Sequence, residues 1–464
     1  MMRKAFLVCL LAGACACGRN EKEATSTYFA GEIVNPTSEY VVLYRGEDVL
    51  DSARLNSDNR FEIRVDSLAP GLYHFLHRPE MQYVYLEPGD SLQMRLNTVS
   101  FDESLAFSGT GEVINNYLIN LFLEAEGEES VIRDSYIPME PGVFLVRMDS
   151  LKEAKLAGLE QLREEENMSE GAFDVARASI QYKNYYYRES YPFWHRRLSP
   201  DKTFHELPDH FYDYRASISY DDPKLVFLRP YYEFMIYHIG NLAFMGCQNS
   251  CEADSHTVKN QLHFNRHQLH LIDSLVNPGE LRDNLFRTVA FEYLLKNDSE
   301  ENFDKFMEDF HRMSGNNRHL GEIEELSDGI RNLRPNLPMP ALQVLNTDDQ
   351  PVLLGDIRPE RDQSEVVFYF WSGPEPKHLK SISEKVSMLE ERHPELRFVG
   401  ICLRTDKEQW KNLIGEYGLD PQWQYWAEDF ESFAHTLVVY HPYKSIVTRN
   451  GLIIDGFANL NTSF

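Results

Sequence analysis

The sequence has little positive charge, and this shortage limits the partners that the protein can bind. Among 464 residues, 46 are lysine or arginine and 73 are aspartate or glutamate, which gives a formal net charge of −27. So large an excess of acidic groups repels the phosphate backbone of nucleic acids, and we expect no nucleic-acid partner. Core-forming residues are not scarce, because 42% of the chain is hydrophobic, which is typical of a folded protein rather than a disordered one.

The sequence also lacks the short motifs that mark several classes of enzyme. It contains no glycine-rich phosphate loop, no Gly-x-Ser-x-Gly nucleophile turn and no His-Glu-x-x-His helix. We therefore expect neither a cofactor nor a catalytic metal ion.

Long apolar runs are missing except near the N-terminus, where residues 5–16 follow two basic residues. That run is shorter than the roughly 20 residues that span a bilayer, and it is typical of a signal peptide. The segment Leu11-Ala-Gly-Ala-Cys-Ala-Cys17-Gly resembles a bacterial lipobox, in which cleavage precedes a lipidated cysteine. The resemblance implies lipidation of Cys17 and anchoring to a membrane of the cell envelope, on its periplasmic or cell-surface side. Cys15 is the alternative acceptor, and ordinary secretion is the alternative fate.

Three patterns follow one another along the remaining chain. Alternating apolar and polar residues between turn signals such as Pro88-Gly-Asp90 predict an antiparallel β-sandwich. Apolar spacings of three and four, as in Leu151–Glu166, then predict helices. We expect a multidomain α+β chain with a signal peptide (1–16), a tether (17–27), a β-sandwich domain (28–108), a helical region (109–335) and an α/β domain (336–464).

The α/β domain begins with a β-α-β unit. The continuous apolar run Val366–Trp371 predicts a strand buried on both faces of a sheet. A helix predicted over Lys377–Arg392 joins it to a second buried strand at Arg397–Leu403. A second helix over Asp406–Gly418 and a hairpin around Asn450-Gly451 complete the order β-α-β-α-β-β.

That order, with Phe370-Trp371 ending the first strand and His441-Pro442 just before the hairpin, resembles the thioredoxin fold. It is most similar to the thiol-disulfide oxidoreductase and peroxiredoxin-like domains of envelope proteins. Upstream patterns such as Asn59-Arg-Phe61 and Tyr85-Leu-Glu-Pro-Gly-Asp90 are similar to Gram-negative lipoproteins with an N-terminal β domain, a helical region and a C-terminal thioredoxin-like domain.

The chemistry of that family is missing here. Its enzymes carry Cys-x-x-Cys where the first strand turns into the helix, because a helix N-terminus lowers the pKa of the attacking thiol. This chain reads Trp371-Ser-Gly-Pro-Glu-Pro-Lys-His378, without cysteine. One alignment puts Ser372 and Glu375 at the cysteine positions, and a gapless alignment puts Glu375 and His378 there. Under both alignments the redox pair is absent, and we expect Ser372 to cap the helix rather than act as a nucleophile.

The resemblance also implies a groove for an extended polypeptide. In the family a cis-proline, here Pro442, exposes backbone groups beside the active site for pairing with a substrate strand. The residues of the expected groove are Trp371, His378, His441, Pro442 and Tyr443. The alternative is a fold element that binds nothing.

Few cysteines follow Cys17: Cys247, Cys251 and Cys402. Cys247 and Cys251 are one helical turn apart, which is compatible with a disulfide, with unpaired thiols or, given the histidines that follow, with a metal site. Cys402 lies in a predicted buried strand, where we expect it to behave as a small apolar residue.

Aromatic and acidic clusters of the helical region each have two interpretations. The aromatic residues of Gln181–His195 are expected to pack helices together, with a glycan or peptide platform as the alternative. The acidic runs 124–129 and 164–166 are expected on solvated faces, with cation binding as the alternative.

Together these patterns favour a lipid-anchored envelope protein whose thioredoxin-like domain is a binding or scaffold module for protein or peptide partners, rather than an enzyme. The alternative is a thiol-disulfide oxidoreductase that works through Cys247 and Cys251, or with a partner that supplies the thiols.

Overall fold

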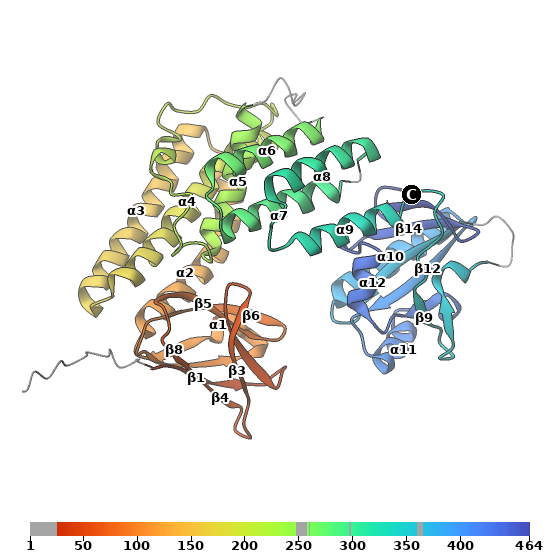
Figure 1. The fold of residues 1–464 in the computed structure, drawn as a ribbon, viewed down its shortest axis with the longest axis horizontal. Coiled ribbons are helices and arrows are strands. Elements are labelled where there is room, and N and C mark those ends of the chain that lie inside the picture. The colour runs from red at the N-terminus through yellow and green to blue at the C-terminus, as the bar shows by residue number, and fades with distance from the viewer. Residues whose placement is uncertain (1–25, 247–257, 259, 297, 360–364) are drawn as a thin grey trace, which may run out of the picture. The chain divides into compact units, whose positions relative to one another are not determined.

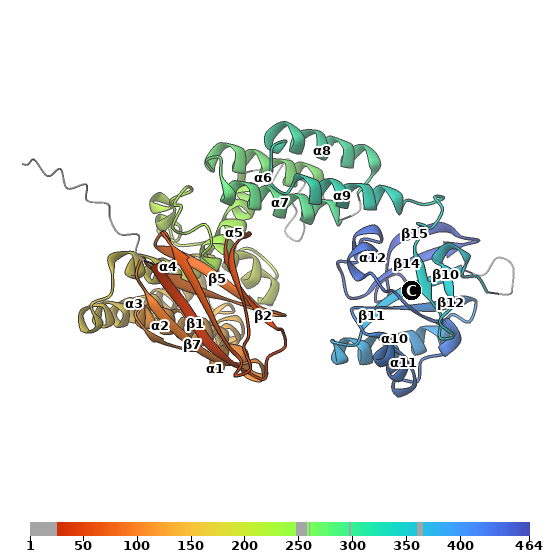
Figure 2. The ribbon, with the colours of Figure 1, turned by 60° about the horizontal axis from the view of Figure 1, so that its bottom comes forward.

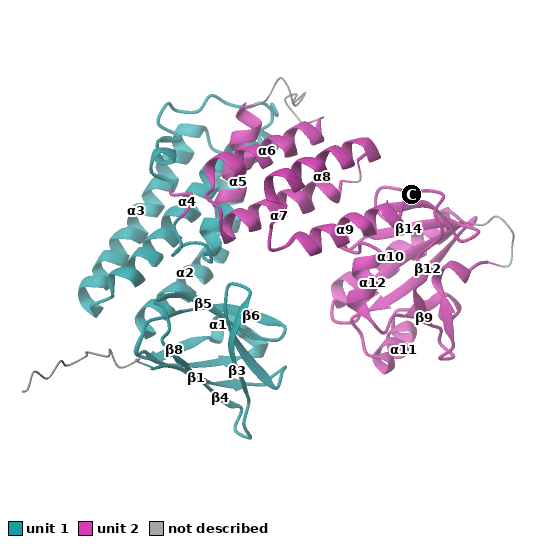
Figure 3. Ribbon diagram, in the orientation of Figure 1, with its two compact units in different colours: residues 1–218, 222–234 teal, residues 219–221, 235–464 magenta. Residues whose placement is uncertain are grey.

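The computed structural model describes residues 26–246, 258, 260–296, 298–359 and 365–464 (Figure 1). The expected lipidation site Cys17 and the pair Cys247 and Cys251 lie outside the described residues. The chain divides into two compact units, one ending at Phe234 and the other containing Met235–Phe464, with residues 219–221 belonging to the second (Figure 3). No helix in the described ranges is both long enough and apolar enough to cross a membrane.

The strands of the first unit form two four-stranded sheets with the orders β4-β1-β7-β8 and β3-β2-β5-β6. Their bounds are β1 Ser26–Val34, β2 Tyr40–Arg45, β3 Asp48–Arg54, β4 Arg60–Asp66, β5 Gly71–His77, β6 Glu80–Leu86, β7 Ser91–Asn97 and β8 Ala106–Gly109. The expectation of a purely antiparallel arrangement is wrong at one pair, because β1 runs parallel to β7 (Figure 2). A parallel pair needs a long connection between its strands, and here β2–β6 form that connection. The alternation of apolar and polar side chains does not show strand direction, so the sequence could not predict this pair.

Alternation along these strands buries one face of each sheet in a shared core. The ring of Phe29 on β1 lies 5.4 Å from that of Phe61 on β4 and 5.6 Å from that of Phe75 on β5, measured between centroids. Since β5 belongs to the other sheet, Phe29 joins the two layers. Ile119 from the following helix packs into the same core.

Helices make up most of the chain between the sheets. Their bounds are α1 Phe101–Ser104, α2 Glu112–Val131, α3 Pro141–Glu166, α4 Glu170–Leu198, α5 Arg229–Gly246, α6 Gln261–Leu275, α7 Glu280–Leu294, α8 Glu300–Ser314 and α9 Leu320–Asn332. Helix α4 begins where the Ser169 hydroxyl accepts a hydrogen bond from the backbone N–H of Ala172, a typical N-cap. Its aromatic residues pack against other helices, as expected: the Tyr191 ring is fully buried and stacks on Phe144 of α3 at 4.0 Å between centroids.

The second unit contains a seven-stranded sheet with the order β10-β9-β13-β12-β11-β14-β15. Its elements are β9 Gln343–Leu345, β10 Pro351–Leu353, β11 Glu365–Ser372, α10 Pro376–Arg392, β12 Leu396–Leu403, α11 Lys407–Glu416, β13 Gln424–Trp426, α12 Phe430–Thr436, β14 Lys444–Arg449 and β15 Leu452–Asn459. The predicted β-α-β unit is present as β11, α10 and β12, with β11 parallel to β12 and antiparallel to β14. Strand β13 and helix α12 were not predicted, because both are too short to show a clear periodicity.

The predicted apolar stripe of α10 is buried against this sheet. Leu379, Ile382, Val386 and Leu389 pack with Tyr369 and Trp371 of β11 in one core. The arrangement fixes the first turn of α10 beside the C-terminal end of β11, where the site predicted from the sequence lies.

Candidate functional site at the start of helix α10

A tight turn connects β11 to α10. Ser372 is the last residue of β11, and the helix begins at Pro376, a residue type that suits the first helical position. The backbone N–H of Gly373 donates to the Thr405 hydroxyl at 2.8 Å, which ties the turn to the segment after β12. A Cβ atom on Gly373 would lie 2.9 Å from side-chain carbons of Leu413 and Thr405, so this position favours glycine.

The helix start is occupied by Glu375 and His378. Glu375 is the N-cap residue through its backbone, since its carbonyl accepts the N–H of Leu379 at 3.0 Å, while its exposed side chain makes no capping bond. The expected capping role of Ser372 is wrong, because the helix begins four residues later and the buried Ser372 hydroxyl has no hydrogen-bond partner. Of the two alignments, the gapless one therefore places its pair at the helix start, with Glu375 at the N-cap and His378 in the first turn.

His378 connects this turn to the segment before β14. Its Nε2 lies 2.9 Å from the carbonyl oxygen of Pro442, so Nε2 is the protonated nitrogen in this contact. The imidazole also meets the Tyr443 ring edge to face, at 5.7 Å between centroids and an interplanar angle of 73°. The Tyr443 hydroxyl in turn lies 3.0 Å from the hydroxyl of Ser381, one helical turn after His378. Three of the residues predicted for the groove thus lie together.

The cis-proline implied by the resemblance is absent. Within the ranges that the structure describes, the one cis peptide bond precedes Pro79. Pro442 is instead the second residue of a four-residue turn closed by the Lys444 N–H and the His441 carbonyl at 3.1 Å, a position that suits trans-proline. The Tyr443 N–H donates to Nδ1 of His441 at 3.2 Å, so the backbone groups that would pair with an extended substrate are engaged within the turn.

Trp371 does not belong to the groove. Its side chain is 1% exposed, and its Nε1 donates to Oε1 of Gln424 on β13 at 3.0 Å. Because side chains alternate along a strand, Trp371 points to the same face of β11 as Tyr369, into the core beneath α10. It supports the site from inside the sheet.

Lys444, the last residue of this turn and the first of β14, was not predicted as a site residue from the sequence. The side chain is 5% exposed, its Nζ donates to the carbonyl of Gly456, and the amine lies 3.7 Å from the centroid of the Phe457 ring. Burial lowers the pKa of Lys444 to about 7, partly offset by the nearby carboxylate of Asp455. No pattern in the sequence distinguishes this lysine from an exposed one at the start of a strand.

Cys402 is the one cysteine in the described part of the chain, and it is fully buried in β12. Burial raises the pKa of its thiol to about 12, which suppresses the reactive thiolate. The side chain is part of the core beneath α10, as expected for a small apolar residue. Among the described side chains, no group of three or more histidine, cysteine, aspartate or glutamate residues is arranged to hold a metal ion.

Comparison with solved structures finds thioredoxin-like proteins. One is a thioredoxin-like protein from Bacteroides caccae, 10% identical, which covers 54% of this chain and 87% of its own with a TM-score of 0.32. Another is a domain of a possible thiol-disulfide isomerase from Cytophaga hutchinsonii, 16% identical, with 28% of this chain and 87% of its own covered and a TM-score of 0.24. A third is the thioredoxin domain of a thiol-disulfide oxidoreductase from Bacteroides vulgatus, 18% identical, with 26% and 87% covered and a TM-score of 0.21.

No protein-family model and no curated protein matches the sequence. At these identities the structural likeness does not extend to activity.

Proposed function

We propose that this chain is a lipid-anchored protein of the cell envelope whose thioredoxin-like part binds polypeptides without catalysing thiol-disulfide exchange. One observation carries the proposal: the start of α10 presents Glu375 at the N-cap and His378 in the first turn, where dithiol enzymes present two cysteines. Exchange proceeds through a mixed disulfide between a thiolate and a substrate sulfur, and neither a carboxylate nor an imidazole forms that bond.

The state of Cys402 supports the same proposal. An attacking thiol has to be exposed and at least partly ionised. Cys402 is fully buried, and its thiol pKa is raised to about 12, so it meets neither condition. It cannot replace the missing pair at the helix start.

The proposed binding surface is formed by the first turn of α10 and the turn before β14. Its exposed residues are Glu375, His441 and Pro442, with His378 and Tyr443 half-buried between them. Because the backbone N–H groups of Tyr443 and Lys444 are already engaged, we propose that a partner is held by side chains rather than by strand addition. The amphipathic rings of Tyr443 and His378 offer contact area at little cost in conformational entropy.

The anchor is proposed from the sequence. Lipidation of Cys17 would supply the anchor, and the polar residues 18–25 would connect it to the first strand, which begins at Ser26.

Binding is tested with reduced, carboxymethylated insulin B chain carrying a fluorescent label, by anisotropy. The chain from residue 18 onward should bind it saturably, and His378→Ala should weaken binding about fivefold or more, as removal of an important interface side chain does. His393→Ala is the matched control, because His393 lies just beyond the other end of α10. Absence of saturable binding, or equal losses in the two variants, would contradict the proposal.

A further inference from the structure

A cavity of about 410 Å³ lies within the first unit, away from the site at α10. It is lined by strand β6, by helices α2, α3 and α4 and by the first residues of α5. This volume falls in the range of small-molecule sites. Much of the wall is apolar or aromatic, with side chains such as Phe122, Met148 and Ile180.

Asn184 on α4 lines this cavity, and one hydrogen-bond acceptor of its side chain is unused. The residue is 4% exposed, and its Nδ2 donates to the carbonyl of Met148 at 2.9 Å. That bond fixes the orientation of the amide, because a carbonyl only accepts. The remaining atom, Oδ1, is buried and has no partner. Since a buried acceptor without a donor is unfavourable, the arrangement suits a ligand that brings an N–H or O–H group.

The charges around the cavity favour a cationic donor over an anionic ligand. All four of its basic side chains are already in ion pairs with acidic neighbours, namely Lys152 with Asp149 (3.0 Å), Lys155 with Glu128 (3.0 Å), Lys183 with Glu233 (3.6 Å) and Arg229 with Glu233 (2.7 Å). Glu126 and Glu129 also line the cavity, and neither is ion-paired with any residue that the structure describes. The surplus charge of the wall is therefore negative.

The pKa of Tyr187, which lines the same cavity, is raised in part by this negative charge. Its side chain is 4% exposed, and its pKa is raised first by burial and then by the carboxylates of Glu129 and Glu128. The negative charge of these carboxylates therefore acts on a buried side chain of the cavity.

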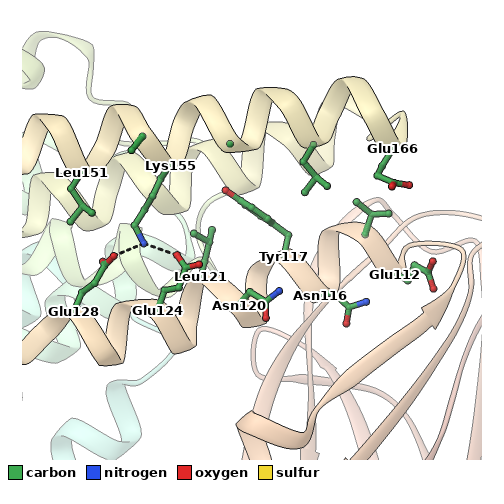
Figure 4. A pocket seen from close by; sticks show the side chains of 14 residues that line it. Glu112, Asn116, Tyr117, Asn120, Leu121, Glu124, Glu128, Leu151, Lys155 and Glu166 are labelled. Atoms are coloured by element: carbon green, nitrogen blue, oxygen red, sulfur yellow. Dashed lines mark hydrogen bonds and ion pairs between the residues drawn. The ribbon is translucent and has the colours of Figure 1, made fainter.

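A second hollow, of about 730 Å³, lies between α2 and α3 (Figure 4). Four residues line both hollows, namely Leu121, Glu128, Leu151 and Lys155. Figure 4 shows the amine of Lys155 held between Glu124 and Glu128, at 2.9 and 3.0 Å. The second hollow is lined by one basic residue, Lys155, and by four glutamates. Its net charge is therefore negative, and it also favours cations.

We propose that the inner cavity binds a small primary amine with an apolar body. The ammonium donates a hydrogen bond to Oδ1 of Asn184, and Glu126 and Glu129 provide the negative charge that selects a cation. The apolar body lies against apolar side chains of the cavity, such as Phe122 and Met148. The proposal does not depend on the function of the surface at α10.

Isothermal titration calorimetry at neutral pH tests the proposal. The affinity for phenethylamine is compared with that for the neutral analogue 2-phenylethanol and for the anion 3-phenylpropionate. Phenethylamine should bind with one-to-one stoichiometry and about tenfold or more tighter than the alcohol, because a hydrogen bond from a charged donor is the stronger one. The anion should not bind. Absence of saturable amine binding, or an affinity for the alcohol or the anion that equals it, overturns the proposal.

Variants locate the site. Asn184→Leu keeps the volume but removes the acceptor, and we expect about a tenfold loss of amine affinity. The double variant Glu126→Gln/Glu129→Gln should weaken binding about threefold, as expected for partly screened charges. Its matched control is Glu160→Gln/Glu164→Gln, two exposed residues of α3 outside both hollows. If Asn184→Leu fails to fold, the double variant decides, because its exposed side chains are not part of the core. Equal affinity in the double variant and its control overturns the proposal.

Discussion

Trp371 and Gln424 are joined by a buried hydrogen bond, in which Nε1 of the indole donates to Oε1 of the amide at 3.0 Å. Nε2 of Gln424 in turn donates to the hydroxyl of Tyr369 at 3.0 Å. One glutamine on β13 therefore satisfies two rings of β11, although β12 lies between these strands in the sheet. The network positions the end of β11, from which the turn into α10 departs.

Loss of this amide should destabilise the second unit. Gln424→Leu leaves the Trp371 N–H and the Tyr369 hydroxyl buried without a partner, and we expect the free energy of unfolding to fall by about 1–3 kcal/mol. Urea unfolding followed by tryptophan fluorescence measures the change. Gln422→Leu, at an exposed position two residues earlier, should change it by less than about 0.5 kcal/mol. Equal effects of the two substitutions would contradict the structural role of Gln424.

Cys402 should be inert in the folded protein. In the chain from residue 18 with Cys247→Ser and Cys251→Ser, Cys402 is the only thiol. With its pKa raised to about 12, roughly one molecule in ten thousand carries the thiolate at pH 8, and burial blocks access to it. A disulfide reagent that releases a coloured thiol should react fully in guanidinium chloride but only slowly without denaturant. Rapid and complete reaction of the folded chain would show that the thiol is accessible.

Lys444 should make stability depend on pH in the alkaline range. Its pKa is about 7 in the folded chain, against 10.5 for an ordinary lysine. Between these values the unfolded chain binds a proton that the folded chain does not, so the free energy of unfolding rises with pH. From pH 7 to about pH 9.5, the natural chain should gain roughly 1 kcal/mol per pH unit relative to Lys444→Met.

Urea unfolding of both proteins across this pH range measures the difference between their free energies of unfolding. Groups that titrate in the same way in both proteins do not contribute to this difference. Lys380→Met, at an exposed position on α10, is the control and should run parallel to the natural chain. A Lys444→Met profile that also runs parallel would contradict the lowered pKa.

Cysteines placed at the helix start should introduce redox chemistry. In a background with Cys247→Ser and Cys251→Ser, Glu375→Cys/His378→Cys puts a thiol at the N-cap and another in the first turn of α10. The helix N-terminus lowers thiol pKa values, and we expect reduction of insulin by dithiothreitol to proceed well above the uncatalysed rate. Ser372→Cys/Glu375→Cys should not do so, because position 372 is buried in β11. Higher activity in this second variant would favour the other alignment.

Much of the second unit could be predicted from the sequence because its signals are long. The apolar run of β11 and the stripe Leu379, Ile382, Val386 and Leu389 on α10 each extend over several residues, and the hairpin turn Asn450-Gly451 is a strong local signal. Strand β13 has three residues, so the partner that it provides to Trp371 could not be foreseen.

Features that depend on particular hydrogen bonds or on contacts between distant residues could not be predicted. The resemblance implied a cis-proline, but a local hydrogen bond between His441 and Lys444 sets a turn with trans-proline. Burial of Lys444 depends on β15, and the cavity at Asn184 is formed by segments more than 100 residues apart. Periodicity reports which face of an element is buried, but not which polar atom lacks a partner there.

The central claim is that this chain carries no dithiol chemistry, and insulin reduction with dithiothreitol as the electron source tests it most directly. The assay compares residues 18–464 with the same chain carrying Cys247→Ser and Cys251→Ser. We predict that both reduce insulin no faster than the uncatalysed control, because Glu375 and His378 stand at the helix start and Cys402 is buried. A rate well above control that is lost in the double variant would contradict the claim and assign the chemistry to Cys247 and Cys251.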